Sequence, residues 1–204
     1  MHSVSFAGQA VTPSKIVCVG RNYVAHIEEL GNEIPADMVV FLKPNSAIGN
    51  TLRAHFGEPL HYEGELVFMV QGGELAAVGF GLDLTRRQLQ GRLKASGLPW
   101  ERAKAFDGAA LFSDFVPLPA SGSKALGLTL DIDGERRQQG GVEWMLYPPA
   151  VILEQLRTFM QLEDGDLIMT GTPAGVGEVP PGATFTGRVL AGKQCLVEAS
   201  WRAQ

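Results

Sequence analysis

The sequence predicts a β-rich α+β fold in a single domain that spans residues 1–204. Glycine and proline contribute 25 and 12 of the 204 residues, a content that favours many turns and short strands over a helical bundle. The apolar segments are mostly short runs bounded by turn residues, as strands are. The few helical patterns do not alternate regularly with these runs, as they would in a parallel doubly wound sheet.

The first part of the chain predicts a strand followed by a short helix. Lys15–Val19 is rich in β-branched residues and ends at Gly20. Asn22 is placed to cap a helix over Tyr23–Leu30, and Gly31 is placed to end it. Because about two helical turns are not stable alone, we expect this helix to depend on packing or on a ligand.

Three strands are expected in the next part of the chain. Val39–Leu42 and Glu65–Val70 are apolar runs bounded by turn residues. Ala76–Leu82 predicts a weaker strand, because Gly79 and Gly81 interrupt it.

Two helical patterns follow, one before the middle of the chain and one in its second half. One begins at the capping-box pattern Thr85-x-x-Gln88 and runs to about Ala95. The other opens at Pro148-Pro149 and ends near Glu163-Asp164-Gly165. The residues expected on its apolar face are Ile152, Leu156, Phe159 and Met160.

A hairpin and a final strand complete the expected elements. Leu128–Ile132 and Glu135–Gln138 flank Asp133-Gly134, which favours a two-residue hairpin turn. Leu167–Thr170 predicts a strand that runs into the glycine-rich turn Gly171–Gly177.

The composition excludes several classes of protein. Apolar residues make up 45% and charged residues 19%, which is not the balance of a disordered chain. The formal net charge of −5 and the lack of a basic run argue against a nucleic-acid partner. The longest apolar runs, such as Met38–Leu42 and Leu66–Val70, are far shorter than the ~20 residues needed to cross a bilayer. Cys18 and Cys195 have neither a metal-type spacing nor a disulfide framework, which favours a reducing cytosol. Together with the short apolar runs, this leads us to expect a soluble, cytoplasmic protein without a membrane partner.

Three acidic residues form the first candidate site. The period of two along a strand places His61, Glu63 and Glu65 on one face. This face is either the solvated side of a sheet or half of a cation site. Asp83 favours the cation site, because it ends a strand where a carboxylate can point into a cleft. Such an oxygen-rich set suits Mg²⁺, Mn²⁺ or Ca²⁺ better than Zn²⁺.

Two further groups are candidates for chemistry. His26 and Glu29, spaced i, i+3, form either an acid–base pair or an incidental pair on an exposed helix face. Lys104 lies between small and aromatic residues and is either solvated or a cation that reaches a substrate carboxylate. The turn Gly171–Gly177 lacks the ending of a phosphate loop, but it offers backbone N–H groups and the Thr172 hydroxyl to an anion.

Several of these segments share one order along most of the chain. They are Val17–Tyr23 with His26 and Glu29, Phe41–Pro44, His61–Glu65, Asp83–Gln90, Lys104–Asp107 and Thr170–Gly177. Together they resemble the fumarylacetoacetate hydrolase family, specifically its short single-domain members similar to acylpyruvate hydrolases and 2-hydroxyhepta-2,4-diene-1,7-dioate isomerases. The resemblance implies a mixed β-roll with a few short helices, usually as a homodimer.

The resemblance also implies roles for individual residues. Glu63, Glu65 and Asp83 would bind Mg²⁺ or Mn²⁺, with Ca²⁺ possible in crystals. The catalytic residues would be His26 and Glu29, a water-activating dyad on a lid, together with Lys104. The implied substrate contacts, which Lys104 would share, are Arg21, Gln90 and Thr172.

The chain departs from the family pattern at three places, one of which is the stretch Gly108–Phe115, where the commoner form contains Cys-Pro. Between Glu65 and Asp83 it passes from Gly72-Gly73 almost directly into the next strand, so the excursion expected there is shortened. Gln88 stands where the family usually has an acid.

The implied activity is metal-dependent hydrolysis of a C–C bond in acylpyruvates such as fumarylpyruvate or acetylpyruvate. The products would be pyruvate and a carboxylic acid, as in aromatic catabolism. Oxaloacetate decarboxylation, or isomerisation or decarboxylation of 2-hydroxyhepta-2,4-diene-1,7-dioate, uses the same kind of enolate, and the sequence does not separate these reactions. A relative that binds metal and a dicarboxylate without turnover is the non-enzyme alternative.

Overall fold

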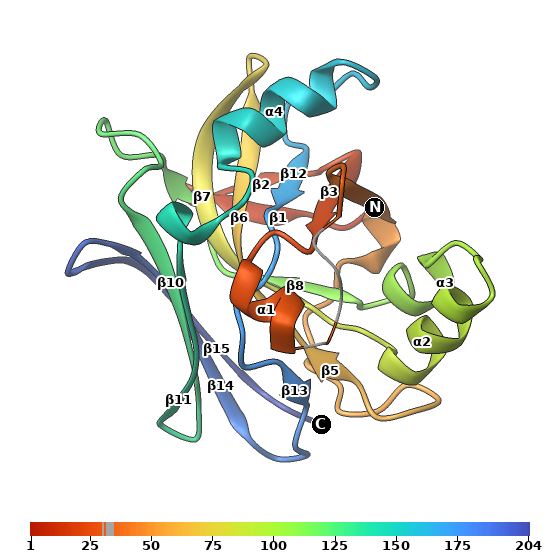
Figure 1. The fold of residues 1–204 in the computed structure, drawn as a ribbon. Coiled ribbons are helices and arrows are strands. Elements are labelled where there is room, and N and C mark those ends of the chain that lie inside the picture. The colour runs from red at the N-terminus through yellow and green to blue at the C-terminus, as the bar shows by residue number, and fades with distance from the viewer. Residues whose placement is uncertain (30, 32–34) are drawn as a thin grey trace.

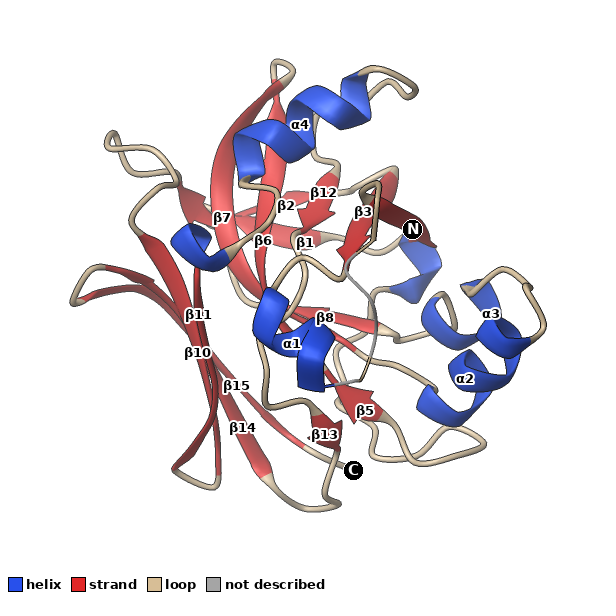
Figure 2. Ribbon diagram, in the orientation of Figure 1, coloured by secondary structure: helices blue, strands red, loops and turns tan. Residues whose placement is uncertain are grey.

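The computed structural model describes residues 1–29, 31 and 35–204, and strands predominate in them (Figures 1 and 2). A seven-stranded mixed sheet has the order β4-β3-β12-β6-β7-β8, with β9 paired to β7. Its strands are β3 (Lys15–Gly20), β4 (Val39–Pro44), β6 (Gly64–Gln71), β7 (Glu74–Asp83), β8 (Ala110–Phe112), β9 (Val116–Pro117) and β12 (Leu167–Met169). The sheet is mixed because β12 runs parallel to β3 and antiparallel to β6.

A second, four-stranded antiparallel sheet packs against the first. Its order is β11-β10-β14-β15, and its strands are β10 (Leu126–Ile132), β11 (Glu135–Gly141), β14 (Thr184–Ala191) and β15 (Gln194–Arg202). Two small two-stranded sheets pair β1 (Val4–Phe6) with β2 (Gln9–Val11) and β5 (His61–Tyr62) with β13 (Gly177–Glu178). The β-rich α+β class and the mixed, curled sheet predicted from the sequence are therefore confirmed.

The helices are short and lie around the larger sheet. They are α1 (Val24–Glu29), α2 (Arg87–Ala95), α3 (Glu101–Lys104) and α4 (Pro149–Arg157), with 3-10 turns η1 (Asn45–Ala47) and η2 (Val142–Trp144). Figure 1 shows α2 and α3 together on one side of the molecule, with α4 beside β6 and β7 and α1 in front of the sheet. None of the helices in the described part of the chain has the length and apolar character needed to cross a membrane.

The main core lies between the two sheets. Phe80 of β7 and Leu66 of β6 are fully buried there, in one cluster with Leu130 of β10 and Phe185 of β14. At Gly187 of β14, an added Cβ would lie 2.2 Å from the Phe80 ring. The close approach of β14 to β7 therefore requires glycine at this position.

The expectation that Ala76–Leu82 is a weak strand is wrong. β7 is 10 residues long and pairs with β6, β8 and β9. A Cβ at Gly79 would lie 3.1 Å from the Phe115 ring, and one at Gly81 would lie 2.6 Å from Val67. These glycines make room for neighbouring side chains in the core, so they permit the strand rather than interrupt it.

The shortened connection between β6 and β7 is confirmed as a tight hairpin. Gln71 pairs with Glu74 across Gly72 and Gly73, whose φ angles are 59° and 77°. Both angles lie in the left-handed region that glycine adopts without strain.

Two predicted helix boundaries need correction, and one helix was missed. Thr85 does not cap α2, because Glu58 Oε1 accepts the backbone N–H groups of Gln88 (2.8 Å) and Leu89 (3.2 Å) instead. The helix α4 ends at Arg157, and Phe159, expected on its buried face, is 60% exposed. The helix α3 was not predicted.

The first helix differs from its prediction at its start, while the glycine predicted to follow its end is confirmed. Asn22 does not cap α1; its side-chain amide bonds instead to the backbone of Tyr147 and to the carbonyl of Thr170. Gly31 has the left-handed φ of 60° expected after a helix, and its N–H donates to the Glu28 carbonyl. Leu30, the predicted last residue of this helix, lies outside the described residues.

Asp166 joins the start of β3 to the turn before β12. Its carboxylate accepts the Ser14 hydroxyl (2.7 Å), the backbone N–H groups of Ser14, Lys15 (3.1 Å each) and Glu163 (2.8 Å), and the Lys15 ammonium (2.5 Å). Burial opposes ionisation of Asp166, but the hydrogen bonds from Lys15 and Ser14 outweigh it and lower its pKa.

Asp166→Asn is therefore expected to cost on the order of 1.5–3 kcal/mol of unfolding free energy at pH 7. Because the pKa of Asp166 is lowered on folding, its stabilisation is present above the ordinary aspartate pKa and is lost as the pH falls through the lowered value. The gap between variant and wild type should therefore narrow on going from pH 7 to pH 3 in urea unfolding. Glu154→Gln, at an exposed position on α4, is the control. A gap independent of pH would contradict this assignment.

Candidate active site

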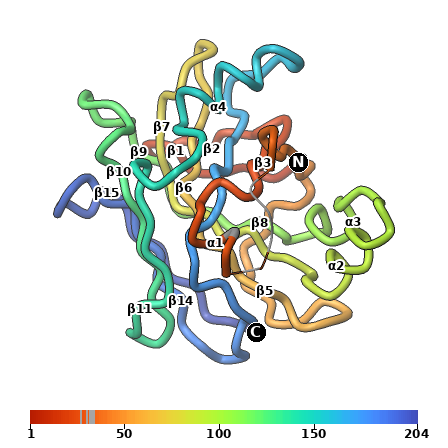
Figure 3. Tube along the Cα trace, viewed as in Figure 1, coloured from red at the N-terminus to blue at the C-terminus, as the bar shows by residue number. Residues whose placement is uncertain are grey.

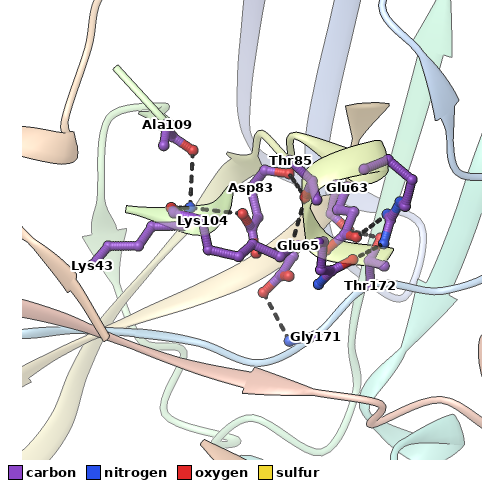
Figure 4. Close-up of polar contacts among 12 residues, drawn as sticks. Lys43, Glu63, Glu65, Asp83, Thr85, Lys104, Ala109, Gly171 and Thr172 are labelled. Atoms are coloured by element: carbon purple, nitrogen blue, oxygen red, sulfur yellow. Dashed lines mark hydrogen bonds and ion pairs between the residues drawn. The ribbon is translucent and has the colours of Figure 1, made fainter. Parts of the chain in front are cut away.

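The three predicted carboxylates come together in the structure. Glu63 lies between β5 and β6, Glu65 is on β6, and Asp83 is the last residue of β7 (Figure 4). One oxygen of each lies within 4.8 Å of the other two, and all three side chains are buried. The Asp83 N–H donates to the Glu63 carbonyl at 2.8 Å, which fixes the two positions relative to each other. Three carboxylate oxygens this close are a fitting donor set for a hard divalent cation.

His61 is not part of this cluster, although its spacing placed it on the same strand face. Its Nε2 lies 3.9 Å from Glu178 Oε1, in the small β5–β13 sheet. The alternation is broken at Glu63, where β5 ends and β6 has not yet begun.

Three cations pair with two of the three carboxylates, Glu63 and Asp83. Lys104 Nζ lies 2.8 Å from Glu63 Oε2 and 2.8 Å from Asp83 Oδ2. Lys43 Nζ lies 2.8 Å from Asp83 Oδ1, and the Arg87 guanidinium pairs with Glu63 Oε1. The sequence analysis assigned no role to Lys43 or Arg87. One feature of the sequence could have indicated Lys43: it directly follows the apolar run of β4, so the strand would bury its charge.

The carboxylates of the cluster differ in their electrostatic environment. Burial raises the pKa of Glu65, and the negative charges of Asp83 and Glu63 raise it further. Burial also opposes ionisation of Glu63, but Lys104 and Arg87 outweigh it and lower its pKa. Without a bound divalent cation, the negative charge of Glu65 is therefore less well compensated than that of Glu63.

The glycine-rich turn after β12 serves the carboxylates of the site itself. The Gly171 N–H donates to Glu65 Oε2 at 2.8 Å, and the Gly175 N–H donates to Glu29 Oε1 at 2.9 Å. The Thr172 hydroxyl donates to the Gly64 carbonyl at 2.9 Å. The expectation that these groups wait for an external anion therefore needs correction, because those two N–H groups and the hydroxyl already hold the protein's own oxygens.

The predicted His26–Glu29 pair is formed on α1. His26 Nδ1 lies 3.2 Å from Glu29 Oε2, and the bond to Gly175 fixes the other Glu29 oxygen. Figure 3 shows how this helix, near the start of the chain, meets the segment between β12 and β13, near its end. His26 is buried and lines the same pocket as the carboxylate cluster.

The residues expected to contact a substrate line this pocket too. Arg21, Gln90, Lys104 and Thr172 all contribute to its wall. Gln90 Oε1 accepts a hydrogen bond from Arg87 at 2.7 Å. The enclosed cavity measures about 40 Å³. Its remaining wall includes three side chains that sequence reasoning did not single out: Phe41, Lys94 and Trp100.

Comparison with known proteins gives one consistent family. Residues 15–200 match the profile described as fumarylacetoacetate (FAA) hydrolase C-terminal. Oxaloacetate tautomerase YcgM of Escherichia coli is 37% identical over 199 residues, covering 87% of this chain and 90% of that protein. The mitochondrial oxaloacetate tautomerase FAHD1 of Arabidopsis thaliana is 40% identical over 189 residues, covering 85% of each. A mitochondrial oxaloacetate decarboxylase of Dictyostelium discoideum is 36% identical over 188 residues, covering 84% of this chain and 86% of that protein.

A solved structure agrees with these relatives. Fumarylpyruvate hydrolase of Pseudomonas aeruginosa, in complex with Mn²⁺ and pyruvate, superposes with a TM-score of 0.88 at 32% identity. The superposition covers 99% of this chain and 95% of that one. The resemblance inferred from the sequence is thus confirmed, and the chain belongs to the fumarylacetoacetate hydrolase family of enzymes.

Proposed function

We propose that the protein is a divalent-metal-dependent enzyme that interconverts the keto and enol forms of oxaloacetate. One observation carries the proposal: the cluster of Glu63, Glu65 and Asp83 lines the same small cavity as His26 and a wall rich in positive charge. The names of the Escherichia coli and Arabidopsis relatives support this reaction. They favour oxaloacetate over the acylpyruvate substrate that the sequence first suggested.

The positive charge that lines the cavity supports a dianionic substrate. Arg21, Arg87, Lys94 and Lys104 all line it. Burial lowers the pKa of Lys94, and the positive charges of Arg21 and Arg87 lower it further, so these cations lie close enough to repel one another. A substrate with two carboxylates would relieve that repulsion.

The chemistry of the residues fits proton transfer at a carbon next to a carbonyl. A divalent cation bound by Glu63, Glu65 and Asp83 would act as a Lewis acid that stabilises negative charge developing on a 2-oxo acid. His26 would accept the C3 proton through Nε2, because its Nδ1 is engaged by Glu29. The C2–C3 double bond forms as that proton leaves, and a proton returned to the C2 oxygen completes the enol.

Hydrolysis of an acylpyruvate is the second candidate function. The similarity to the fumarylpyruvate hydrolase of Pseudomonas aeruginosa favours it. It requires a water molecule between His26 and the distal carbonyl of the substrate, whereas enolisation requires none. Decarboxylation of oxaloacetate, the activity named for the Dictyostelium relative, also needs no activated water.

An assay with three substrates tests the proposal. Enol oxaloacetate, acetylpyruvate and fumarylpyruvate are each supplied with Mg²⁺ or Mn²⁺, while the ultraviolet absorbance of the enol and the release of pyruvate are followed. We expect the enol of oxaloacetate to decay much faster than in buffer that contains the same metal. Pyruvate release from the acylpyruvates at a higher kcat/KM would establish the second candidate instead.

Removal of metal is expected to abolish the activity reversibly. EDTA should stop enol–keto conversion, and dialysis followed by Mn²⁺ should restore it, because the cluster holds only carboxylate ligands. Buffer that contains the same metal and substrate but no protein is the control for uncatalysed conversion. Full activity in the EDTA-treated protein would contradict a metal-dependent reaction.

A further inference from the structure

The ammonium group of Lys104 occupies the carboxylate cluster. Its Nζ donates to Glu63 Oε2 and Asp83 Oδ2, both at 2.8 Å, and to the Thr85 hydroxyl at 2.6 Å. Three acceptors use all the hydrogens that an ammonium can donate. The side chain is buried, 2% exposed, and has the Phe41 ring centre 5.4 Å from Nζ. Two of the three candidate metal ligands are therefore bound to a cation that belongs to the protein (Figure 4).

Lys104 already holds one oxygen each of Glu63 and Asp83, so a divalent cation that bound those two oxygens would compete with it. Mg²⁺ binds oxygen at about 2.0–2.1 Å with strict geometry, so its ligands must turn their lone pairs towards it. Two cations that share Glu63 Oε2 and Asp83 Oδ2 in a buried site would also repel each other strongly. A metal that binds through these two oxygens therefore requires the Lys104 ammonium to withdraw from at least one of them.

Lys43 differs from Lys104 in what holds it. Besides Asp83, its ammonium bonds to the backbone carbonyls of Lys104 and Ala109, contacts that a metal would leave intact. Among the described residues, the Lys104 ammonium bonds to side chains alone, and two of these are carboxylates of the cluster. Of these two lysines, Lys104 is therefore the one that a metal would displace.

We propose that Lys104 is a tethered cation that takes the place of the metal in the metal-free protein, and that metal binding moves its ammonium from Glu63 and Asp83 towards the cavity. This inference rests on the metal site of the proposed function and adds an order of events. The metal enters first, and the freed ammonium then becomes available to an anionic substrate. The role expected for Lys104 from the sequence, contact with a substrate, would thus depend on the metal.

The first test measures metal affinity rather than activity. Lys104→Met keeps an unbranched side chain one atom shorter than lysine and removes its charge. We expect EDTA-stripped Lys104→Met to bind Mn²⁺ at least about tenfold more tightly than the wild type, in titrations that follow free Mn²⁺ by electron paramagnetic resonance. Its metal-free form should melt at a lower temperature, and Mn²⁺ should raise its Tm by more than it raises that of the wild type.

Two matched variants isolate the contact from general charge effects. Lys94→Met removes a positive charge from the wall of the same cavity, and we expect it to change Mn²⁺ affinity by less than about threefold. Lys104→Arg keeps the charge and should bind Mn²⁺ no more tightly than the wild type. Equal or weaker Mn²⁺ binding by folded Lys104→Met would overturn the proposal. If the wild type itself binds no Mn²⁺, the metal part of the proposed function fails instead.

A measurement on the wild type covers the case in which Lys104→Met does not fold. Buried, hydrogen-bonded lysine ammonium groups exchange slowly and can be observed by ¹⁵N NMR. Titration with diamagnetic Mg²⁺ should shift the signal of Lys104 and leave that of Lys43 near its starting position. Lys104→Arg assigns the signal. Two signals that both stay unchanged at saturating Mg²⁺ would show that Lys104 is not displaced.

Discussion

Glu65→Gln is expected to remove metal-dependent activity while the protein stays folded. The variant keeps the shape of the side chain, and its amide oxygen can still accept the Gly171 N–H. It loses the negative charge that a divalent cation would bind, so Mn²⁺ affinity should fall on the order of 100-fold or more, given that even residues outside the ligand set cost 10–100-fold. The measurement is an Mn²⁺ titration beside an assay of enol–keto conversion.

The metal-free variant should be at least as stable as the wild type. Burial and the charges of Asp83 and Glu63 raise the pKa of Glu65, which means that its ionised form is unfavourable in the folded protein without metal. A neutral amide removes this repulsion. Glu178→Gln, at an exposed position on β13, is the control and should change neither Mn²⁺ affinity nor Tm appreciably. Unchanged Mn²⁺ binding by folded Glu65→Gln would exclude Glu65 as a ligand.

The carboxylate cluster could be predicted from the sequence because its geometry is mostly local. Glu63 and Glu65 are two residues apart, so a strand directs both to one side even where β5 gives way to β6. Asp83 ends the strand that returns from the Gly72-Gly73 hairpin, which brings it opposite the start of β6. His26 and Glu29 are likewise fixed by the period of one helix.

The cations of the site could not be assigned in the same way. Lys43 reaches Asp83 from β4, which is not adjacent to β7 in the sheet, and Lys104 reaches it from α3, a helix with no clear sequence signal. These pairs depend on the packing of segments far apart in the chain. The same reason explains why the capping of α2 by Glu58, 30 residues before Gln88, was missed in favour of the local Thr85 pattern.

The glycine-rich turn binds anions, but the sequence does not show which anions these are. Its backbone N–H groups do bind anions, as expected, but the anions at Gly171 and Gly175 are the carboxylates of Glu65 and Glu29. One turn therefore holds a member of the carboxylate cluster and a member of the histidine pair at once. This shared support fixes the distance between the two halves of the proposed chemistry.

His26→Ala is expected to separate proton transfer from decarboxylation. Enolisation of oxaloacetate requires a base at C3, so its kcat/KM should fall by the ~10²–10⁴-fold typical of a lost general base. Loss of CO₂ from oxaloacetate, where the protein catalyses it, requires stabilisation of negative charge but no base, and should fall much less. Both rates are compared at saturating Mg²⁺ after the fold of each variant has been checked.

Two further variants make the result specific to His26. Asp83→Asn should damage both reactions, because both depend on the carboxylate cluster. Glu29→Gln should reduce enolisation less than His26→Ala, because it weakens the hold on Nδ1 but leaves the imidazole in the pocket. If His26→Ala lowers enolisation and decarboxylation equally, His26 does not act as a dedicated base. Its buried ring would then serve to close the cavity, and the loss would follow from water that enters in its place.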